Sequence, residues 1–436
     1  MSLQASAVTG PLLHRSSEVG RLVSASVQSW NNGQLGRSMG LASMATAMEA
    51  SEARVGSSPS ARIWYATLVT RARGLASARR ILTEDQSAVH SFAEVDGQPE
   101  ELMCQAETAL ARGDLDSATA AAEAGLRLAQ QTGHRRPVPI GNLVMAVSAT
   151  RQLDPNVGLL YANRLRDNAL FGHSALMAGQ CAWAVAQALE ARDGTASIAC
   201  LLVDLVHDKA MTQELLVSQP AAAAWLVRAS QQLGDETIAA RIVSLAGELG
   251  TRNRTFRTIQ ASAAHAKGLH ERNAAALDRA SALHLDSWAR ASALEDASAV
   301  RFTRRSEHDQ AAELLKRAAD GYRTVGARRD VLRVASKLRE LEVNGGRIPH
   351  RTGRFRRTGS QLTDTEYAVA DLVSQGLTNG RVARQLFISP HTVAFHLKKI
   401  FRKLDVSSRV ELASTWTRLP QEHTTTPGQV VGYVGA

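Results

Sequence analysis

A helix with two opposite faces is predicted by the stretch SPHTVAFHLKKIFRKL at residues 389–404. Ser389 is a favourable N-cap, and Pro390 fits the first helical position, where its missing N–H is not needed. Apolar residues recur on one face at helical spacing: Val393, Leu397, Ile400 and Leu404. The opposite face is mainly cationic and carries His391, Phe395, Lys398 and Arg402, with Lys399 and Lys403 beside it. One face is therefore expected to pack against a core while the other stays exposed.

Three further short helices are predicted around this stretch. The first runs from about Thr363 to Gln375, with Glu366 completing a capping box, and ends at Gly376. A second runs from Thr378 to Leu386, and a fourth continues from about Ser407 through Trp416. A cationic helix that follows a short helix and a tight turn is suited to the major groove of DNA.

The positive charge of the chain is concentrated in the same region. The 436 residues carry a formal net charge of +10. Residues 343–419 hold ten Arg and three Lys against five acidic residues, which gives 13 − 5 = +8. A compact basic module on a nearly neutral body favours a polyanionic partner, most simply nucleic acid, although a solvated basic surface would look the same.

The composition of the remaining chain favours helices. Ala accounts for 72 of the 436 residues, and aromatic residues make up only 4%. Such a chain is expected to be all-α rather than a β-sandwich or barrel. Its length suits two or three domains. We expect an α-helical repeat domain at 1–342, a flexible basic linker at 343–361, a DNA-binding domain at 362–418 and a disordered tail at 419–436.

The body shows a repeat of about 40 residues. Polar turn points are spaced by 40, 40, 40, 39, 42, 36 and 36 residues, at Gln34, Gly74, Asp114, Asp154, Asp193, Asp235, Glu271 and Glu307. A small residue follows each by four positions, which lets two helices of a hairpin approach closely: Ser38, Ala78, Ala118, Gly158, Ser197, Ala239, Ala275 and Ala311. Stacked hairpins of this kind form a helical solenoid. An irregular helical domain without true repeats is the alternative.

Several functions are disfavoured by the sequence. It has no Gly-Lys dipeptide for a Walker-type phosphate loop, no Gly-x-Ser-x-Gly elbow, and no His-Glu-x-x-His or Cys-x-x-Cys pair. We therefore expect no catalytic residues, no metal site and no cofactor. No apolar run approaches a membrane span, no secretory signal is evident, and the three Cys suit a reducing cytoplasm.

Residues 362–416 resemble the LuxR-type helix-turn-helix domain. The matching positions include Gly376-Leu377-Thr378-Asn379, Leu386-Phe387-Ile388-Ser389-Pro390, Thr392-Val393, His396-Leu397 and Lys403-Leu404. Two positions depart from the family pattern: Gly380 replaces a charged residue, and Asp405 replaces the glycine that ends the third helix. The body, particularly 311–341, resembles the tetratricopeptide-like (TPR-like) region of the large MalT-like regulators. Those carry an N-terminal ATPase that this chain lacks, so we expect a shorter bacterial relative or a fragment.

The resemblance and the exposed face together give the expected site residues. Lys398, Lys399 and Phe395 are expected in the major groove, although Phe395 could instead contact the linker or the body. Phosphate contacts are expected from Thr378, Asn379, Arg402 and Lys403. The remaining positions of the expected DNA-binding surface are His391, Thr392 and Ala394. His396 is expected to be structural, and the basic linker is either a tether or an arm along DNA.

Members of this family generally dimerise through the fourth helix, which makes Val410, Ala413 and Ser414 candidate interface positions. The sequence thus predicts a cytoplasmic transcriptional regulator that binds double-stranded promoter DNA, as a homodimer. An unknown protein or small-molecule effector is expected on the helical body. The alternative is an interaction scaffold whose basic module binds DNA without reading its sequence.

Overall fold

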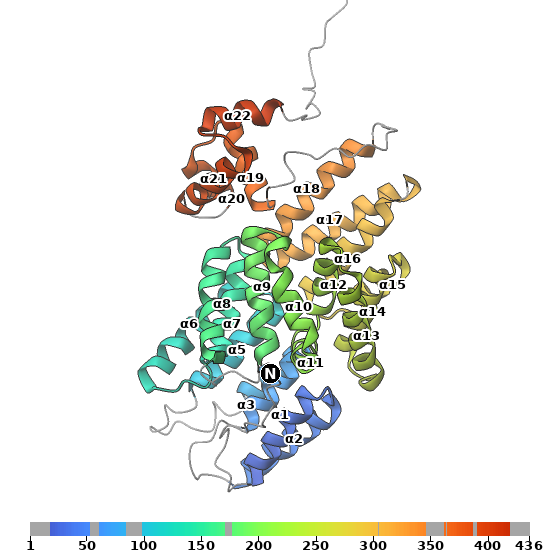
Figure 1. Ribbon diagram of the computed structural model, residues 1–436. Coiled ribbons are helices and arrows are strands. Elements are labelled where there is room, and N and C mark those ends of the chain that lie inside the picture. The colour runs from blue at the N-terminus through green and yellow to red at the C-terminus, as the bar shows by residue number, and fades with distance from the viewer. Residues whose placement is uncertain are drawn as a thin grey trace, which may run out of the picture. The chain divides into compact units, whose positions relative to one another are not determined.

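The computed structural model describes residues 18–52, 61–83, 98–170, 177–303, 305–345, 362, 364–386 and 390–418. Every regular element in these ranges is a helix, which confirms the all-α prediction (Figure 1). The chain divides into two compact units, residues 1–338 and 339–436. The predicted tail at 419–436 and residues 346–361 of the predicted linker lie outside the described residues.

The first unit is a series of helices joined by short turns. Their bounds are α1 (Glu18–Asn31), α2 (Leu35–Glu52), α3 (Ala61–Arg71), α4 (Leu75–Thr83), α5 (Gln98–Arg112), α6 (Leu115–Thr132), α7 (Val138–Arg151), α8 (Pro155–Leu170), α9 (Ala178–Asp193), α10 (Ala199–His207), α11 (Lys209–Ser218), α12 (Ala222–Leu233), α13 (Glu236–Arg252), α14 (Arg257–His270), α15 (Ala274–Leu283), α16 (Ser287–Phe302), α17 (His308–Thr324) and α18 (Arg328–Gly345). Two single-turn 3₁₀ helices, η3 (Thr195–Ile198) and η4 (Arg305–Glu307), precede α10 and α17. Helical pairs pack on each other as hairpins on both sides of most predicted turn points: α1 with α2, α3 with α4, α5 with α6, α7 with α8, α12 with α13, α14 with α15, and α16 with α17. The short helices α10 and α11 depart from this repeat of helical pairs.

The acidic turn residues cap the second helix of several hairpins, as the sequence indicates. The carboxylates of Asp114, Asp154 and Asp235 accept hydrogen bonds from the backbone N–H three residues later, at 3.0, 3.1 and 3.0 Å. A carboxylate there satisfies an otherwise unpaired N–H and interacts favourably with the helix dipole. The pattern changes at Asp193, which is the last residue of α9 and is followed by η3.

The small residues of the repeat are buried in six of the eight positions: Ser38, Ala78, Ala118, Gly158, Ala239 and Ala311. At Gly158 an added Cβ would lie 2.3 Å from Thr150 Oγ1, so the close approach of α7 and α8 requires glycine. Ser197 and Ala275 are exposed, and the prediction is wrong there. Near Ala275, Asn273 rather than Glu271 caps α15, so the position four residues after the cap is Leu277, which is fully buried.

Turns of the N-terminal hairpins also pack against helices far along the chain. Asn253 donates to the Gly33 carbonyl at 2.9 Å, and Arg73 pairs with Asp286 at 2.8 Å. At Gly113, where φ is +86°, an added Cβ would lie 2.3 Å from Val325 Cγ1. Glu190 pairs with Arg329 at 2.6 Å. Repeats of this body therefore contact distant helices as well as their neighbours.

The last helix of the body is longer than the sequence suggests. We expected the body to end at Glu342, but α18 continues to Gly345. Residues 343–345, the start of the predicted linker, are therefore helical. Ala327, just before α18, and Val334 within it are fully buried, and Arg333 forms ion pairs through its guanidinium, so both apolar and ionic contacts hold α18.

Candidate nucleic-acid interface

The second unit contains the four helices expected at its C-terminal end. They are α19 (Asp364–Ser374), α20 (Asn379–Leu386), α21 (Pro390–Leu404) and α22 (Arg409–Arg418). Thr363, Phe387, Ile388 and Ser389 lie outside the described residues. The buried core comes mainly from the apolar faces of these helices: Val369, Ala370, Leu372, Val373, Val382, Ala383, Val393, Leu397, Ile400, Val406, Leu412 and Trp416.

Left-handed residues terminate α19 and α21. Gly376 has φ +83°, and Leu377 N–H donates to the Leu372 carbonyl at 3.3 Å. Asp405 has φ +53°, and Val406 N–H donates to the Phe401 carbonyl at 2.9 Å. This is the hydrogen-bond pattern of a Schellman cap, which usually has glycine at the left-handed position. Asp405 therefore takes the conformation that we expected of it in place of glycine.

The face of α21 opposite the core presents most of its positive charge outward. Ala394, Lys398 and Arg402 are exposed, while Phe395 and Lys399 are half-buried. The side chains of Lys398 and Arg402 make no ion pair or hydrogen bond within the described part of the chain. Both cations thus remain available to an anionic partner. The side chains of His391 and Thr392 lie outside what the structure describes, although both residues belong to α21.

Lys399 and Phe395 lie together on this face. The Lys399 ammonium is 4.9 Å from the centre of the Phe395 ring, in a cation–π arrangement one helical turn apart. This contact places the Lys399 ammonium over the face of the Phe395 ring. Next to them, His396 is buried, and burial lowers its pKa to about 4. Its burial confirms the expected structural position of His396.

Lys403 is placed differently from the other predicted contacts. Its ammonium lies 2.7 Å from Oε2 of Glu366 on α19, and the Glu366 side chain is fully buried. A cation that neutralises a buried carboxylate is held by the domain itself. Lys403, which the sequence suggested as a phosphate contact, therefore forms an ion pair that links α21 to α19.

The start of α20 is organised by a side chain that the sequence analysis did not single out. Arg409 of α22 donates to the Asn379 side-chain oxygen and to the Leu377 carbonyl. With its oxygen occupied, Asn379 has its amide N–H groups left to donate. Thr378 is exposed, and its hydroxyl accepts from Arg381 N–H at 3.4 Å. Arg409 and Asn379 are 30 residues apart, so no local sequence pattern indicates that they interact.

The predicted interface positions on α22 differ in exposure. Val410 is 79% exposed, which is unusual for a large apolar side chain. Ala413 is half-buried, and the exposed Ser414 donates its hydroxyl to the Glu411 carbonyl at 2.9 Å. Leu412 and Trp416 of the same helix are buried in the core of the unit. Val410 is therefore a large apolar side chain that α22 leaves in solvent.

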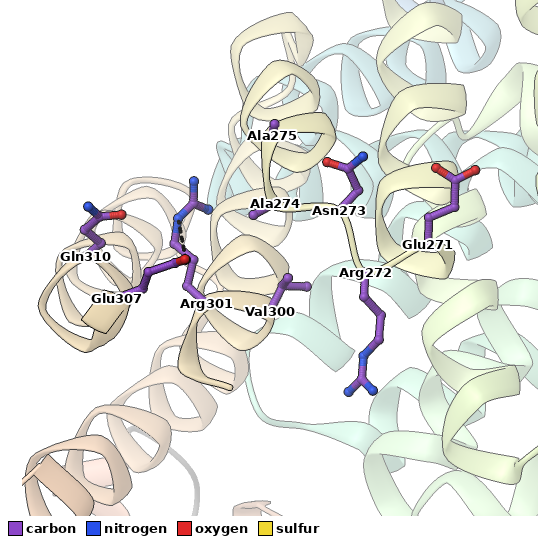
Figure 2. A pocket seen from close by; sticks show the side chains of 9 residues that line it. All are labelled: Glu271, Arg272, Asn273, Ala274, Ala275, Val300, Arg301, Glu307 and Gln310. Carbon is purple, nitrogen blue, oxygen red and sulfur yellow. Dashed lines mark ion pairs between the residues drawn. The ribbon is translucent and has the colours of Figure 1, made fainter. Parts of the chain in front are cut away.

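The body contains a shallow polar pocket of about 510 Å³ between the α14–α15 turn and helices α16 and α17 (Figure 2). Arg272, Asn273 and Gln310 lie along its wall. Arg301 is held by Asp278 and lies 3.9 Å from Glu307. The charged residues of its lining balance, with Arg272 and Arg301 against Glu271 and Glu307. Across the described ranges, no group of three or more His, Cys, Asp or Glu side chains is arranged to hold a metal ion.

The four helices, in which the short α20 is followed by a basic helix with an exposed face, are those of a helix-turn-helix domain. Residues 360–416 match the family described as bacterial regulatory proteins, luxR family. The C-terminal domain is therefore a LuxR-family helix-turn-helix domain, as the sequence indicates. None of the helices in the described part is both long and apolar enough to cross a bilayer.

Regulators from several bacteria share this domain. An HTH-type transcriptional regulator of Mycobacterium tuberculosis is 47% identical over 57 residues, 13% of this chain and 6% of the relative. The nitrate/nitrite response regulator protein NarL of Escherichia coli is 31% identical over 127 residues, 27% of this chain and 58% of NarL. The similarity thus spans only a small part of the first of these relatives.

A comparison of the chain with solved structures gives a weak likeness. The alignment with a Rap protein, solved in complex with competence and sporulation factor, covers 91% of this chain and 99% of the Rap chain. Its TM-score is 0.37 and its sequence identity is 11%.

Proposed function

We propose that this chain is a transcriptional regulator that binds promoter DNA through α21. The observation that carries the proposal is the exposed basic face of α21, within a domain of the luxR family. In a helix-turn-helix domain such a helix enters the major groove. Lys398 and Lys399 would donate to base edges there, and Phe395 would contact the methyl groups of thymine.

Phosphate contacts hold the domain in register. Arg402 in the last turn of α21 and the amide N–H groups of Asn379 at the start of α20 would donate to phosphates. His391, Thr392, Ala394 and Thr378 complete the proposed surface. Lys403 contributes by neutralising Glu366, so its effect on DNA binding would come through the stability of the domain.

A second copy of the chain is the proposed partner on α22. Val410 presents an exposed apolar side chain there, with Ala413 and Ser414 beside it along the helix. Two copies would read two half-sites whose centres are separated by about one helical turn of DNA, or a multiple of it. The helical body would receive a protein or small-molecule signal, and the protein would act in the cytoplasm.

In-vitro selection from random duplex DNA tests this function, with the full chain at about 150 mM salt, where non-specific binding is weakened. We expect enrichment of a site with two-fold symmetry. Arg254→Ala is the matched control, because Arg254 is an exposed arginine of the body. Lys398→Ala is expected to lose or change the selected sequence. Strong binding without any enrichment would contradict sequence reading and favour a non-specific scaffold.

A further inference from the structure

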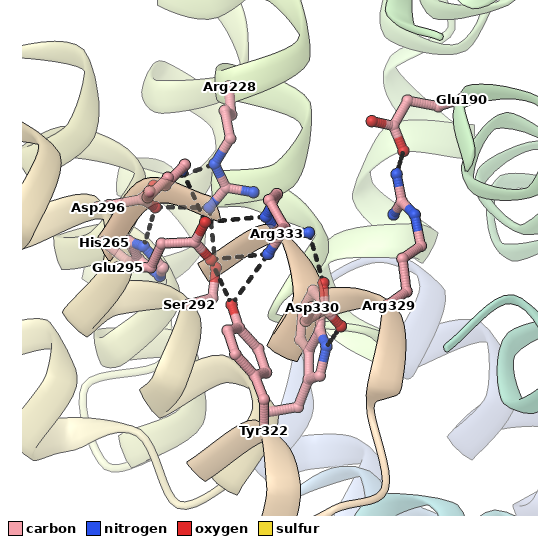
Figure 3. A network of polar contacts seen from close by, with 12 residues as sticks. Glu190, Arg228, His265, Ser292, Glu295, Asp296, Tyr322, Arg329, Asp330 and Arg333 are labelled. Atoms are coloured by element: carbon pink, nitrogen blue, oxygen red, sulfur yellow. Dashed lines mark hydrogen bonds and ion pairs between the residues drawn. The ribbon is translucent and has the colours of Figure 1, made fainter. Parts of the chain in front are cut away.

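A cluster of charged side chains fills the junction of α12, α16 and α18 in the body (Figure 3). Asp296 pairs with Arg228 at 2.6 Å and shares a hydrogen bond with His265 at 2.9 Å. Glu295 pairs with Arg333 and Lys337, each at 2.7 Å. The cluster joins helices that lie far apart in the sequence.

The start of α16 extends this cluster toward the N-terminal hairpins. Trp288 donates its indole N–H to Asp330 of α18 at 2.8 Å, and Asp330 also pairs with Arg333 at 2.6 Å. Asp286, which caps α16, pairs with Arg73 at 2.8 Å. Each of these carboxylates already has a cationic partner.

Arg151, the last residue of α7, is a cation beside this cluster that forms no ion pair within the described residues. Its guanidinium lies over the ring of Trp288, 4.6 Å from the ring centre. Its Nε is buried without a hydrogen-bond partner. Burial lowers its pKa, while nearby Asp286 and Asp330 act in the opposite direction. Arg151 as a whole is half-buried, and its two Nη atoms are not among the buried unpaired atoms of the described residues, so the end of the guanidinium is open to solvent.

The charges of the cluster leave one cation in excess. Its cations are Arg73, Arg151, Arg228, Arg333 and Lys337, and its carboxylates are Asp286, Glu295, Asp296 and Asp330, which gives 5 − 4 = +1. Because the four carboxylates have partners among the other four cations, the excess charge is located at Arg151. An uncompensated charge in a poorly solvated site is costly, and a bound anion removes that cost.

We propose that Arg151 and Trp288 form a binding site for a small molecule with a single carboxylate. The planar guanidinium matches a carboxylate with two parallel hydrogen bonds, and one negative charge balances the cluster. The buried indole ring of Trp288 stacks on the guanidinium and holds its plane in position. Bound there, the ligand would join the end of α7 to α16, next to the Asp330 contact with α18.

The test uses the full chain and sodium acetate at constant ionic strength. Thermal unfolding gives the stabilisation as a function of acetate concentration, and saturation-transfer NMR detects the acetate methyl group on the protein. Neither readout contains DNA, so the result does not depend on the proposed DNA binding. Arg151→Met keeps an apolar side chain over Trp288 without the charge, and Arg254→Met removes an exposed arginine as the control.

We expect saturable stabilisation and saturation transfer in the wild type and in Arg254→Met. Loss of a charge-assisted hydrogen-bonded pair should raise the apparent Kd for acetate by about tenfold or more in Arg151→Met. Equal responses in all three proteins, or no saturation transfer in the wild type, would overturn the site. If Arg151→Met does not fold, the uncharged Arg151→Gln serves instead, and an unchanged Kd in that variant would also overturn the site.

Discussion

The substitution Glu295→Gln tests how strongly the charge cluster holds α18 on the body. Glu295 is 2% exposed and accepts from Tyr322 Oη at 2.9 Å, from Arg333 at 2.7 and 2.8 Å, and from Lys337 at 2.7 Å. Glutamine has nearly the same shape and can still accept from one of these donors. The substitution therefore removes the negative charge with little change in packing.

The cost follows from the charges that remain around the substituted side chain. Removing one partner of a buried ion pair costs about 3–5 kcal/mol, because the other charge is left uncompensated. Arg333 keeps Asp330 at 2.6 Å, and Lys337 is 39% exposed and can be hydrated. Both reduce the penalty, so we expect a loss at the lower end, about 3 kcal/mol.

Urea unfolding followed by circular dichroism measures this loss. The control is Glu313→Gln, the same substitution at an exposed position of α17, for which we expect less than about 0.5 kcal/mol. A double variant with Arg333→Met should lose less than the sum of the two single losses, because the two residues interact directly. A loss for Glu295→Gln no larger than that for Glu313→Gln would refute this reasoning.

Three further predictions concern other sites. Burial opposes ionisation of Asp296, but its partners Arg228 and His265 outweigh burial and lower its pKa to about 2 from the ordinary 3.8. The stabilisation by the ionised Asp296 is therefore fully present above pH 3.8 and is lost as the pH falls through about 2. Urea unfolding across this range should show a shallower pH dependence of the free energy of unfolding in Asp296→Asn. Gly380→Ala should stabilise the second unit by about 0.5–1 kcal/mol, since Gly380 lies in α20 with open space around an added Cβ, and thermal unfolding showing a loss would contradict this. Lys403→Met should destabilise the domain by about 3 kcal/mol by leaving Glu366 buried without this cation, and unchanged unfolding would show that the pair is dispensable.

Local patterns in the sequence predicted the helix-turn-helix domain well. The apolar stripe of α21 and the proline at its start fix the helix, and the structure places Val393 and Ile400 in the core. The body hairpins were predictable for the same reason, because an acidic cap and a small residue lie within one helical turn. Before Ala275 the cap lies two residues later than the pattern predicts, so the predicted small residue is exposed instead of buried.

Contacts between distant residues were not predictable. Arg73 and Asp286 are separated by 213 residues, and nothing near either residue indicates its partner. The same holds for Glu366 and Lys403, 37 residues apart, where the lysine looked like a DNA contact because it lies on a basic helix. Arg151 also required the structure, since its lack of a partner depends on the pairing of every charge around it.

We propose that Lys398, on the exposed face of α21, reads DNA sequence. Fluorescence anisotropy with the selected duplex and with a scrambled duplex, at several salt concentrations, measures the ratio of the two Kd values for the wild type and Lys398→Ala. A base contact is worth about 1–3 kcal/mol, so we expect the ratio to fall by about 5- to 150-fold in Lys398→Ala. An unchanged ratio would show that Lys398 does not read the sequence, and equal affinity of the wild type for both duplexes would show that the domain does not discriminate between them.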